Sequence, residues 1–235
     1  ADHRYLQRVD RRQRQMCIRD RVLAALHEGV FPMPITGDEV PRELRGATAW
    51  WSPMRRGILL PGQLKVARSL RKTTKHHTTS VDRAFDEVIT RCADPTRPYA
   101  WIGDRVMEVY RYLHDRGWAH SVETWNAQGR LVGGLYGVSV GGFFSGESMF
   151  HDPEYGRDAS KTALMRLVCE LGPGLLDVQW STPHLARLGV IDVDRAEYLA
   201  LLSDALERPS PQWTSLDDPA WNGGHLLERL RKMTN

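Results

Sequence analysis

The sequence predicts a mixed α+β fold, and three observations support this prediction. Segments 120–125 and 131–138 are rich in apolar and β-branched residues and flank Gln128-Gly129, a pattern typical of a hairpin of antiparallel strands. From Ser160, a suitable N-cap, to Leu171 the apolar residues recur at helical spacing, and a short strand-like segment, 175–180, follows. Helices and strands alternate irregularly, without the repeated strand–helix–strand units that build a parallel sheet.

Capping signals predict the other helices. An apolar helix begins near Val22 and ends before Gly29, which suits the left-handed position after a helix. A second helix is expected over 106–115. Thr182-Pro183 begins a short helix, and Asp194 with the glutamate three residues later forms a capping box for another.

The chain of 235 residues is long enough for one large domain with a smaller appendage. We expect residues 1–21, which are rich in Arg and lack an amphipathic period, to be poorly ordered or foreign to the native sequence, and we assign them no function. Residues 22–60 are expected to form a small N-terminal domain that ends in an aromatic and apolar stretch. Residues 61–235 then form the main domain.

Composition favours a water-soluble protein of the cytoplasm. Hydrophobic residues make up 41% and charged residues 26% of the chain, and no apolar run is long enough to span a bilayer. The N-terminal residues do not resemble a secretory signal. Cys17, Cys92 and Cys169 are odd in number and widely spaced, which argues against a disulfide framework or a metal-binding pair.

Positive charge is concentrated in one short segment, although the formal net charge is only +3. The segment contains Arg68, Arg71, Lys72, Lys75, His76 and His77. It is consistent with a polyanion contact, but basic runs are common on soluble surfaces and the charge pattern alone favours a solvated helix end, so charge does not establish a function.

Two strand segments carry the candidate catalytic residues. Strand alternation places Asp177 and Gln179 on one face of segment 175–180, with apolar residues on the other. Glu147 follows a glycine at the end of a third predicted strand near 142–145. The simpler alternatives are the polar face of an edge strand for the pair and a surface carboxylate for Glu147.

Several other chemistries find no support in the sequence. Ser148 lacks the following glycine of a hydrolase nucleophile elbow. Gly133-Gly134 and Gly141-Gly142 are not part of a phosphate-binding loop. The histidines form no helical metal-binding pair, so we predict no metal site.

A family resemblance appears when eight short blocks are taken together in order. The blocks are Glu28–Pro32, Trp50–Pro53, Trp101-Ile102, His120–Glu123, Gly133–Val138, Gly146–Phe150, Ala159–Leu164 and Leu176–Gln179. They resemble the leucyl/phenylalanyl-tRNA–protein transferases over roughly residues 22–206. The resemblance implies a small N-terminal domain and a larger acyltransferase domain of the GNAT type that uses aminoacyl-tRNA and no acetyl-CoA.

The resemblance also implies the reaction and its partners. Leu or Phe, and less well Met, passes from leucyl-tRNA or phenylalanyl-tRNA to the α-amine of proteins that begin with Arg or Lys. The modified proteins are thereby marked for degradation. Aminoacyl-tRNA is the co-substrate, so no further cofactor and no membrane are expected.

Site roles follow from what aminolysis of an activated ester requires. Gln179 is expected to align the attacking amine by accepting its hydrogen bond, and Asp177 to fix and polarise Gln179. Glu147 is assigned to the cationic acceptor. The donor side chain is expected in an apolar pocket, for which the candidates are Leu135, Met149, Leu164, Leu167 and Leu171.

Contacts with the tRNA are assigned to aromatic and basic residues. Trp51 and Trp101 are the candidates for stacking on the terminal adenine. Arg68, Arg71, Lys72 and Lys75 are the candidates for contacts with phosphates. The competing interpretation is a non-catalytic RNA-binding module, which would use the same residues without needing Asp177 or Gln179. An acetyl-CoA-dependent enzyme would need a pyrophosphate loop that the sequence lacks.

Overall fold

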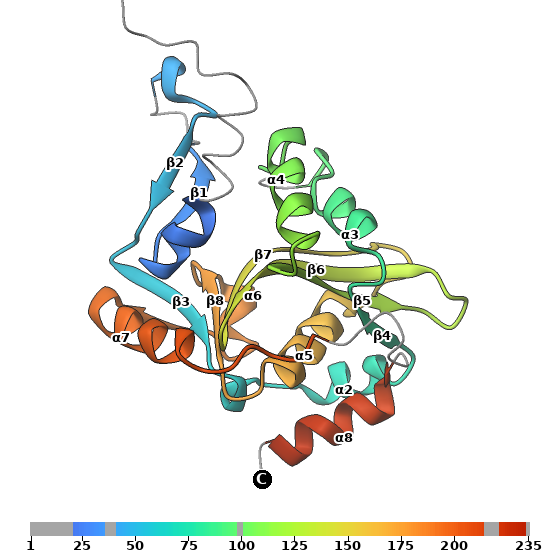
Figure 1. Cartoon of the computed structure of the whole chain (residues 1–235). Coiled ribbons are helices and arrows are strands. Elements are labelled where there is room, and N and C mark those ends of the chain that lie inside the picture. The colour runs from blue at the N-terminus through green and yellow to red at the C-terminus, as the bar shows by residue number, and fades with distance from the viewer. Residues whose placement is uncertain (1–20, 36–40, 98–100, 214–220, 234–235) are drawn as a thin grey trace, which may run out of the picture. The chain divides into compact units, whose positions relative to one another are not determined.

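The computed structural model in Figure 1 describes residues 21–35, 41–97, 101–213 and 221–233. Contacts between residues divide the chain into two units, the first ending at Trp51 and the second beginning at Ser52. All of the segment 1–21 except its last residue lies outside the described residues. The predicted division into three parts stays a prediction.

The first unit consists of a short helix and a two-stranded sheet. The helix covers residues 21–27, and Gly29 follows it with a left-handed φ of 69°, as the sequence predicted. Strands β1 (Phe31–Pro34) and β2 (Thr48–Trp51) pair in antiparallel fashion. The 3-10 helix η1 (Arg42–Leu44) precedes β2.

The second unit is built around an eight-stranded sheet. Its strands, in spatial order, are β10 (Trp221–Asn222), β4 (Thr78–Val81), β5 (Ala119–Trp125), β6 (Leu131–Val140), β7 (Phe143–His151), β8 (Leu175–Gln179), β3 (Arg55–Leu59) and β9 (Ile191–Asp194). All neighbouring strands are antiparallel except β7 and β8, which run parallel. The predicted mixed α+β fold is therefore confirmed.

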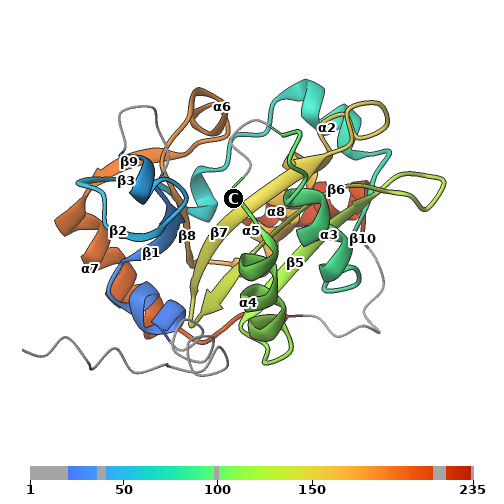
Figure 2. The same ribbon diagram turned by 90° about the horizontal axis from the view of Figure 1, so that it is seen from above.

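Helices cover both faces of this sheet (Figures 1 and 2). The helices of the second unit are η2 (Pro61–Gln63), α2 (Arg68–Thr74), α3 (Phe85–Cys92), α4 (Asp104–His114), α5 (Ala159–Leu171), α6 (Pro183–Ala186), α7 (Arg195–Leu206) and α8 (Gly223–Met233). Helices α3 and α4 lie on one face of β5, β6 and β7, whereas α5, α2 and α8 lie on the other. No helix among the described residues is long and apolar enough to cross a membrane.

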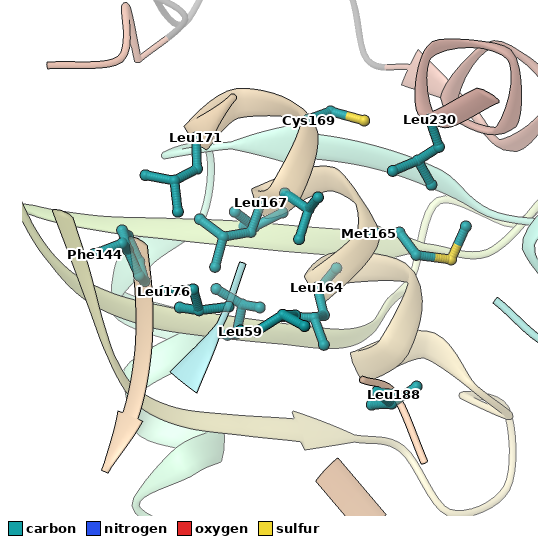
Figure 3. Packing of buried hydrophobic residues seen from close by; sticks show 14 of the residues in the cluster. Leu59, Phe144, Leu164, Met165, Leu167, Cys169, Leu171, Leu176, Leu188 and Leu230 are labelled. Atoms are coloured by element: carbon teal, nitrogen blue, oxygen red, sulfur yellow. The ribbon is translucent and has the colours of Figure 1, made fainter. Parts of the chain in front are cut away.

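The main hydrophobic core lies between α5 and the sheet. Figure 3 shows Leu164, Leu167 and Leu171 of α5 beside Leu59 and Leu176 of the strands. Each of these side chains is at most 4% exposed. Burying one such leucine contributes about 1.5–3 kcal/mol, so α5 is held firmly against the strands that carry the candidate site.

The predicted caps agree with the structure in two places and differ in one. Thr182 caps α6 by accepting a hydrogen bond from Leu185 N, and Asp194 caps α7. Helix α5 begins one residue before Ser160, and its N-cap is Asp158 with a φ of 60°. Ser160 is therefore buried inside the first turn, because the left-handed turn at Asp158 starts the helix earlier than the sequence pattern indicated.

Candidate functional site

Two β-bulges lie in the neighbouring strands that carry the candidate residues. In β7, Ser148 pairs with Tyr136 and Gly146 pairs with Gly137 of β6, so Glu147 is an extra residue without a partner on β6. In β8, Asp177 pairs with Ile58 and Gln179 pairs with Gly57 of β3, so Val178 is an extra residue without a partner on β3. Bulges bend a strand and redirect its side chains, and they are common beside active sites.

Asp177 is fully buried and lies in a network of donors. Arg56 of β3 donates from Nε to Oδ1 at 2.9 Å and from Nη2 to Oδ2 at 2.6 Å, a bidentate ion pair. The Tyr198 hydroxyl of α7 donates to Oδ2 at 2.9 Å. Burial lowers the pKa of Arg56, but hydrogen bonding and attraction to Asp177 outweigh this and raise it. Arg56 therefore remains a cation beside this carboxylate.

Gln179 ends β8 in a conformation that is unusual for a residue with a side chain. Its φ is 60°, in the left-handed region, and its backbone N–H donates to Asp177 Oδ1 at 2.9 Å. Its side-chain Nε2 donates to the Ser145 hydroxyl at 3.0 Å. Asp177 therefore contacts the backbone of Gln179, whereas Ser145 binds its amide. Strained non-glycine backbone of this kind clusters at functional sites.

Glu147 is partly buried and close to this pair. Ser145 Oγ lies 3.1 Å from Glu147 Oε1 and donates to it. Burial raises the pKa of Glu147 to about 7, while Ser145 and the nearby Tyr110 hydroxyl oppose the rise. The carboxylate thus changes its charge close to neutral pH, which is a property of groups at functional sites.

Two buried tyrosines stand beside Glu147. The Tyr136 hydroxyl on β6 has no hydrogen-bond partner within the described part of the chain, whereas the Tyr110 hydroxyl on α4 interacts with the carboxylate of Glu147. Burial and the charge of Glu147 raise the pKa of both phenols well above the usual value, so both remain protonated donors. They surround the carboxylate with polar groups that can receive a ligand.

An apolar pocket of about 160 Å³ adjoins Glu147. It is lined by Leu135, Tyr136, Gly146, Glu147, Ser148, Met149, Leu164, Leu167, Leu176, Val178 and Leu185. Four of the five residues proposed for the donor pocket are among them. The fifth, Leu171, is buried in the core further along α5 and does not line this pocket.

The residues proposed for tRNA contacts are not among those that line this pocket. Trp51 belongs to the first unit, where its indole Nε1 donates to Met33 O at 3.1 Å, and Trp101 belongs to the second. The side chains of the basic segment on and just after α2 are exposed, namely those of Arg68, Arg71, Lys72 and Lys75. Arg71 also donates to the carbonyl oxygen of Val66.

Several residues of the site were missed by sequence reasoning. In the sequence, Arg56 directly precedes the apolar residues 57–60, and a charged residue at the start of such a run is the signal that could have indicated a buried cation. Tyr198 lies on α7, where an aromatic residue is typical of ordinary core packing and gives no sign of a contact with Asp177. Ser145 is the last residue of the third predicted strand, and nothing local distinguishes it from an ordinary strand serine.

The described residues contain no group of three or more His, Cys, Asp or Glu side chains that could hold a metal ion. Cys92 and Cys169 are buried free thiols, and burial raises their pKa to about 11 and about 12. They are therefore protonated and unreactive at neutral pH.

Comparison with known proteins identifies the family. The family model described as leucyl/phenylalanyl-tRNA protein transferase matches residues 58–203. A relative named leucyl/phenylalanyl-tRNA–protein transferase from Laribacter hongkongensis is 40% identical over 211 residues, which cover 85% of each chain. Relatives of the same name from Desulforapulum autotrophicum and Anaeromyxobacter dehalogenans are 42% and 44% identical, covering 80% and 81% of this chain and 81% and 80% of theirs.

A solved structure, that of L-PGS from Bacillus licheniformis, overlaps with a TM-score of 0.37 and 10% identity, covering 66% of this chain and 65% of the other. The sequence matches define an enzyme of the transferase class. The chain belongs to the leucyl/phenylalanyl-tRNA–protein transferase family.

Proposed function

We propose that the enzyme transfers Leu or Phe, and less well Met, from aminoacyl-tRNA to the α-amine of proteins that begin with Arg or Lys. Such proteins would thereby be marked for degradation. The observation that carries the proposal is an apolar pocket that adjoins a partly buried carboxylate, Glu147, beside the hydrogen-bonded pair Asp177 and Gln179.

The donor side chain occupies the apolar pocket. Its volume of about 160 Å³ is close to that of a cavity of about 150 Å³ that is known to bind benzene, so an isobutyl or benzyl group fits. Leu135, Met149, Leu164 and Leu167 supply its apolar walls. Because such a pocket discriminates by shape and by about 1–3 kcal/mol per methylene group, some use of Met is expected.

Transfer itself is aminolysis of an activated ester. The lone pair of the neutral α-amine attacks the ester carbonyl carbon, the bond to the ribose oxygen breaks, and the amine proton passes to that oxygen. Gln179 is too weak a base to keep the proton. Its amide oxygen instead accepts a hydrogen bond from the attacking amine and holds it in line with the carbonyl.

Asp177 contributes to this reaction by holding Gln179 in position. Its carboxylate accepts the backbone N–H of Gln179, and Arg56 and Tyr198 also donate to that carboxylate and fix its position. This network supports the left-handed turn at Gln179.

Glu147 is assigned to the acceptor because a carboxylate binds a guanidinium or ammonium group. A bound cation would lower the pKa of Glu147 and keep it ionised, which couples acceptor binding to deprotonation.

The remaining assignments concern the tRNA and the architecture. Arg68, Arg71, Lys72 and Lys75 are proposed to contact phosphates, and their exposure is compatible with this. Trp51 and Trp101 are proposed to stack on the terminal adenosine. We further propose that the second unit is a GNAT-like acyltransferase domain, preceded by a small N-terminal domain. Because the ester is already activated, no cofactor is needed.

The decisive experiment incubates the purified protein with leucyl-tRNA labelled in the amino acid and with a peptide that begins with Arg. We expect label on this peptide, but none on the same peptide acetylated at its α-amine, since the nucleophile is blocked. Equal labelling of the blocked peptide would refute transfer to the α-amine. Binding of tRNA without any transfer would favour the non-catalytic RNA-binding module.

A further inference from the structure

Three side chains form a chain of hydrogen bonds across the two bulged strands. Gln179 Nε2 lies 3.0 Å from Ser145 Oγ, and Ser145 Oγ lies 3.1 Å from Glu147 Oε1. Ser145 is fully buried and pairs directly with Asp177 across the parallel strands. The bulge leaves Glu147 without a pairing residue on β6, and its carboxylate lies next to Ser145.

A hydroxyl has one proton to donate, and its direction therefore matters. While Glu147 is ionised it accepts that proton, since a charge-assisted hydrogen bond is roughly twice as strong as a neutral one. The lone pairs of Ser145 then receive the N–H of Gln179. The amide oxygen of Gln179 is turned away from Ser145 and is available to the attacking amine.

We propose that Ser145 is a positioning residue that couples the ionisation of Glu147 to the orientation of the Gln179 amide. This inference rests on the proposed function, in which the amide oxygen of Gln179 aligns the acceptor.

Protonation of Glu147 reverses the direction of the two hydrogen bonds that join Glu147, Ser145 and Gln179. The carboxyl group then donates its proton to Ser145 Oγ, and Ser145 in turn donates to Gln179 Oε1. The amide rotates by half a turn about its terminal torsion, which is soft for a glutamine. Gln179 now presents its NH₂ group, which cannot accept a hydrogen bond from the amine, and transfer stops.

The surroundings of Glu147 place this event in an accessible pH range. The groups that face it are Tyr110 from α4, Tyr136 from β6, Asp177 from β8 and Arg56 from β3, besides Ser145 itself. Burial and Asp177 raise the pKa of Glu147, whereas Tyr110, Ser145 and Arg56 lower it, with a result of about 7.

The test is the pH profile of single-turnover transfer with saturating leucyl-tRNA and an Arg-starting peptide, in the wild type and in S145A. For S145A we expect kcat at alkaline pH to fall roughly three- to tenfold, the worth of one hydrogen bond. In the wild type the acidic loss of activity due to Glu147 lies below about pH 7, because the bound acceptor cation lowers the pKa of this carboxyl. In S145A this loss should disappear, leaving only the titration of the acceptor amine, which both proteins share. KM for the peptide should stay within about twofold, because the carboxylate remains and a tenfold change would need about 1.4 kcal/mol.

S139A is the matched control. Ser139 is a buried serine on β6 that pairs with the neighbour of Ser145, and its hydroxyl has no hydrogen-bond partner within the described ranges. S139A should keep the wild-type rate and profile. A wild-type profile in S145A, or equal losses in S145A and S139A, would overturn the inference.

A second variant guards against misfolding. If S145A does not fold, S145C carries the test, because a thiol is a weaker donor and acceptor. Its kcat must fall while KM for the peptide holds, and an unchanged kcat overturns the coupling. Absence of any transfer by the wild type would instead refute the proposed function.

Discussion

Arg56 and Asp177 illustrate how one buried ion pair organises the candidate site. Their side chains are 1% and 0% exposed, so neither charge can be satisfied by water. Taking such charges out of water is costly, and only the bidentate geometry together with Tyr198 and the Gln179 backbone offsets the cost. The ion pair therefore contributes more to fixing the position of the site residues than to the net stability of the protein.

Arg56→Met should lower the free energy of unfolding by about 3–5 kcal/mol, because it leaves the Asp177 charge buried without its cation. Adding Asp177→Asn to this variant should recover part of the loss, since a neutral amide costs less to bury. Urea unfolding of the two single variants and the double variant measures both effects. A loss below about 1 kcal/mol in Arg56→Met would mean that Asp177 is not charged in the folded protein.

Glu147→Gln tests the raised pKa of Glu147 through stability. A carboxyl with a raised pKa in the folded state binds more protons there than when unfolded. Its contribution to stability is therefore present below about pH 4.5 and is lost as pH rises through about 7. Above that pH, Glu147→Gln should be more stable than the wild type by about 3 kcal/mol, with little difference near pH 4.

The measurement is the thermal midpoint of both proteins across this pH range. A constant difference between them would show that Glu147 titrates normally and would remove the physical basis of the coupling through Ser145.

At the scale of residues, sequence reasoning selected side chains that stand out chemically. Glu147, Asp177 and Gln179 are polar groups inside apolar strands, and the structure brings all three within one network through Ser145. Ser145 itself could not be selected, because its importance arises from a pairing between β7 and β8 that no local pattern encodes.

At the scale of elements, the two bulges determine where the site lies. Simple alternation predicts which side chains share a face, but it does not predict an extra residue at Glu147 or Val178. Neither position is a glycine, so the usual local signal of a bulge is absent. The bulges depend on partner strands that are distant in sequence. The third predicted strand, near 142–145, is too short for the same reason, since β7 continues through the bulge to His151 and Glu147 lies inside this strand rather than after its end.

Gly57→Ala tests whether β3 must approach the end of β8 closely. A Cβ at Gly57 would lie 2.6 Å from Ser181 N and 2.8 Å from the carbonyl carbon of Trp180, and these backbone atoms must shift. We expect transfer to fall at least tenfold, because the backbone just after Gln179 moves, with a loss of stability of about 1–3 kcal/mol.

Gly62→Ala is the matched control, since a Cβ there meets no atom within 4 Å. Single-turnover transfer and urea unfolding should both remain near the wild-type values for this variant. Normal transfer in Gly57→Ala would show that the position of β3 does not constrain the site.

At the scale of the whole molecule, the fold class was accessible from sequence but the order of the strands was not. The hairpin of β5 and β6 joins near neighbours in the chain, so a turn signal predicted it. Strand β3, in contrast, lies between β8 and β9, more than a hundred residues away in sequence. Such pairings depend on burial over the entire sheet and leave no periodic trace.

Helix α5 connects the pocket with the C-terminal segment. One part of its surface carries Leu164 and Leu167, which line the pocket, and α8 packs against another part (Figure 1). Arg166 of α5 is buried, and its guanidinium lies 3.6 Å from the centre of the Trp221 ring. Trp221 therefore covers a buried cation and fixes the segment that leads into α8.

Trp221→Ala should destabilise the protein by about 2–4 kcal/mol, because it removes a packed ring and a partly desolvated cation–π contact. For a chain of this length the thermal midpoint should fall by roughly 5–15 °C. Trp118→Ala is the control, since Trp118 is 38% exposed and should cost little. At a temperature where both variants are folded, KM for leucyl-tRNA should match the wild type, because Trp221 does not line the pocket. A large rise in KM with an unchanged midpoint would instead place Trp221 in contact with the tRNA.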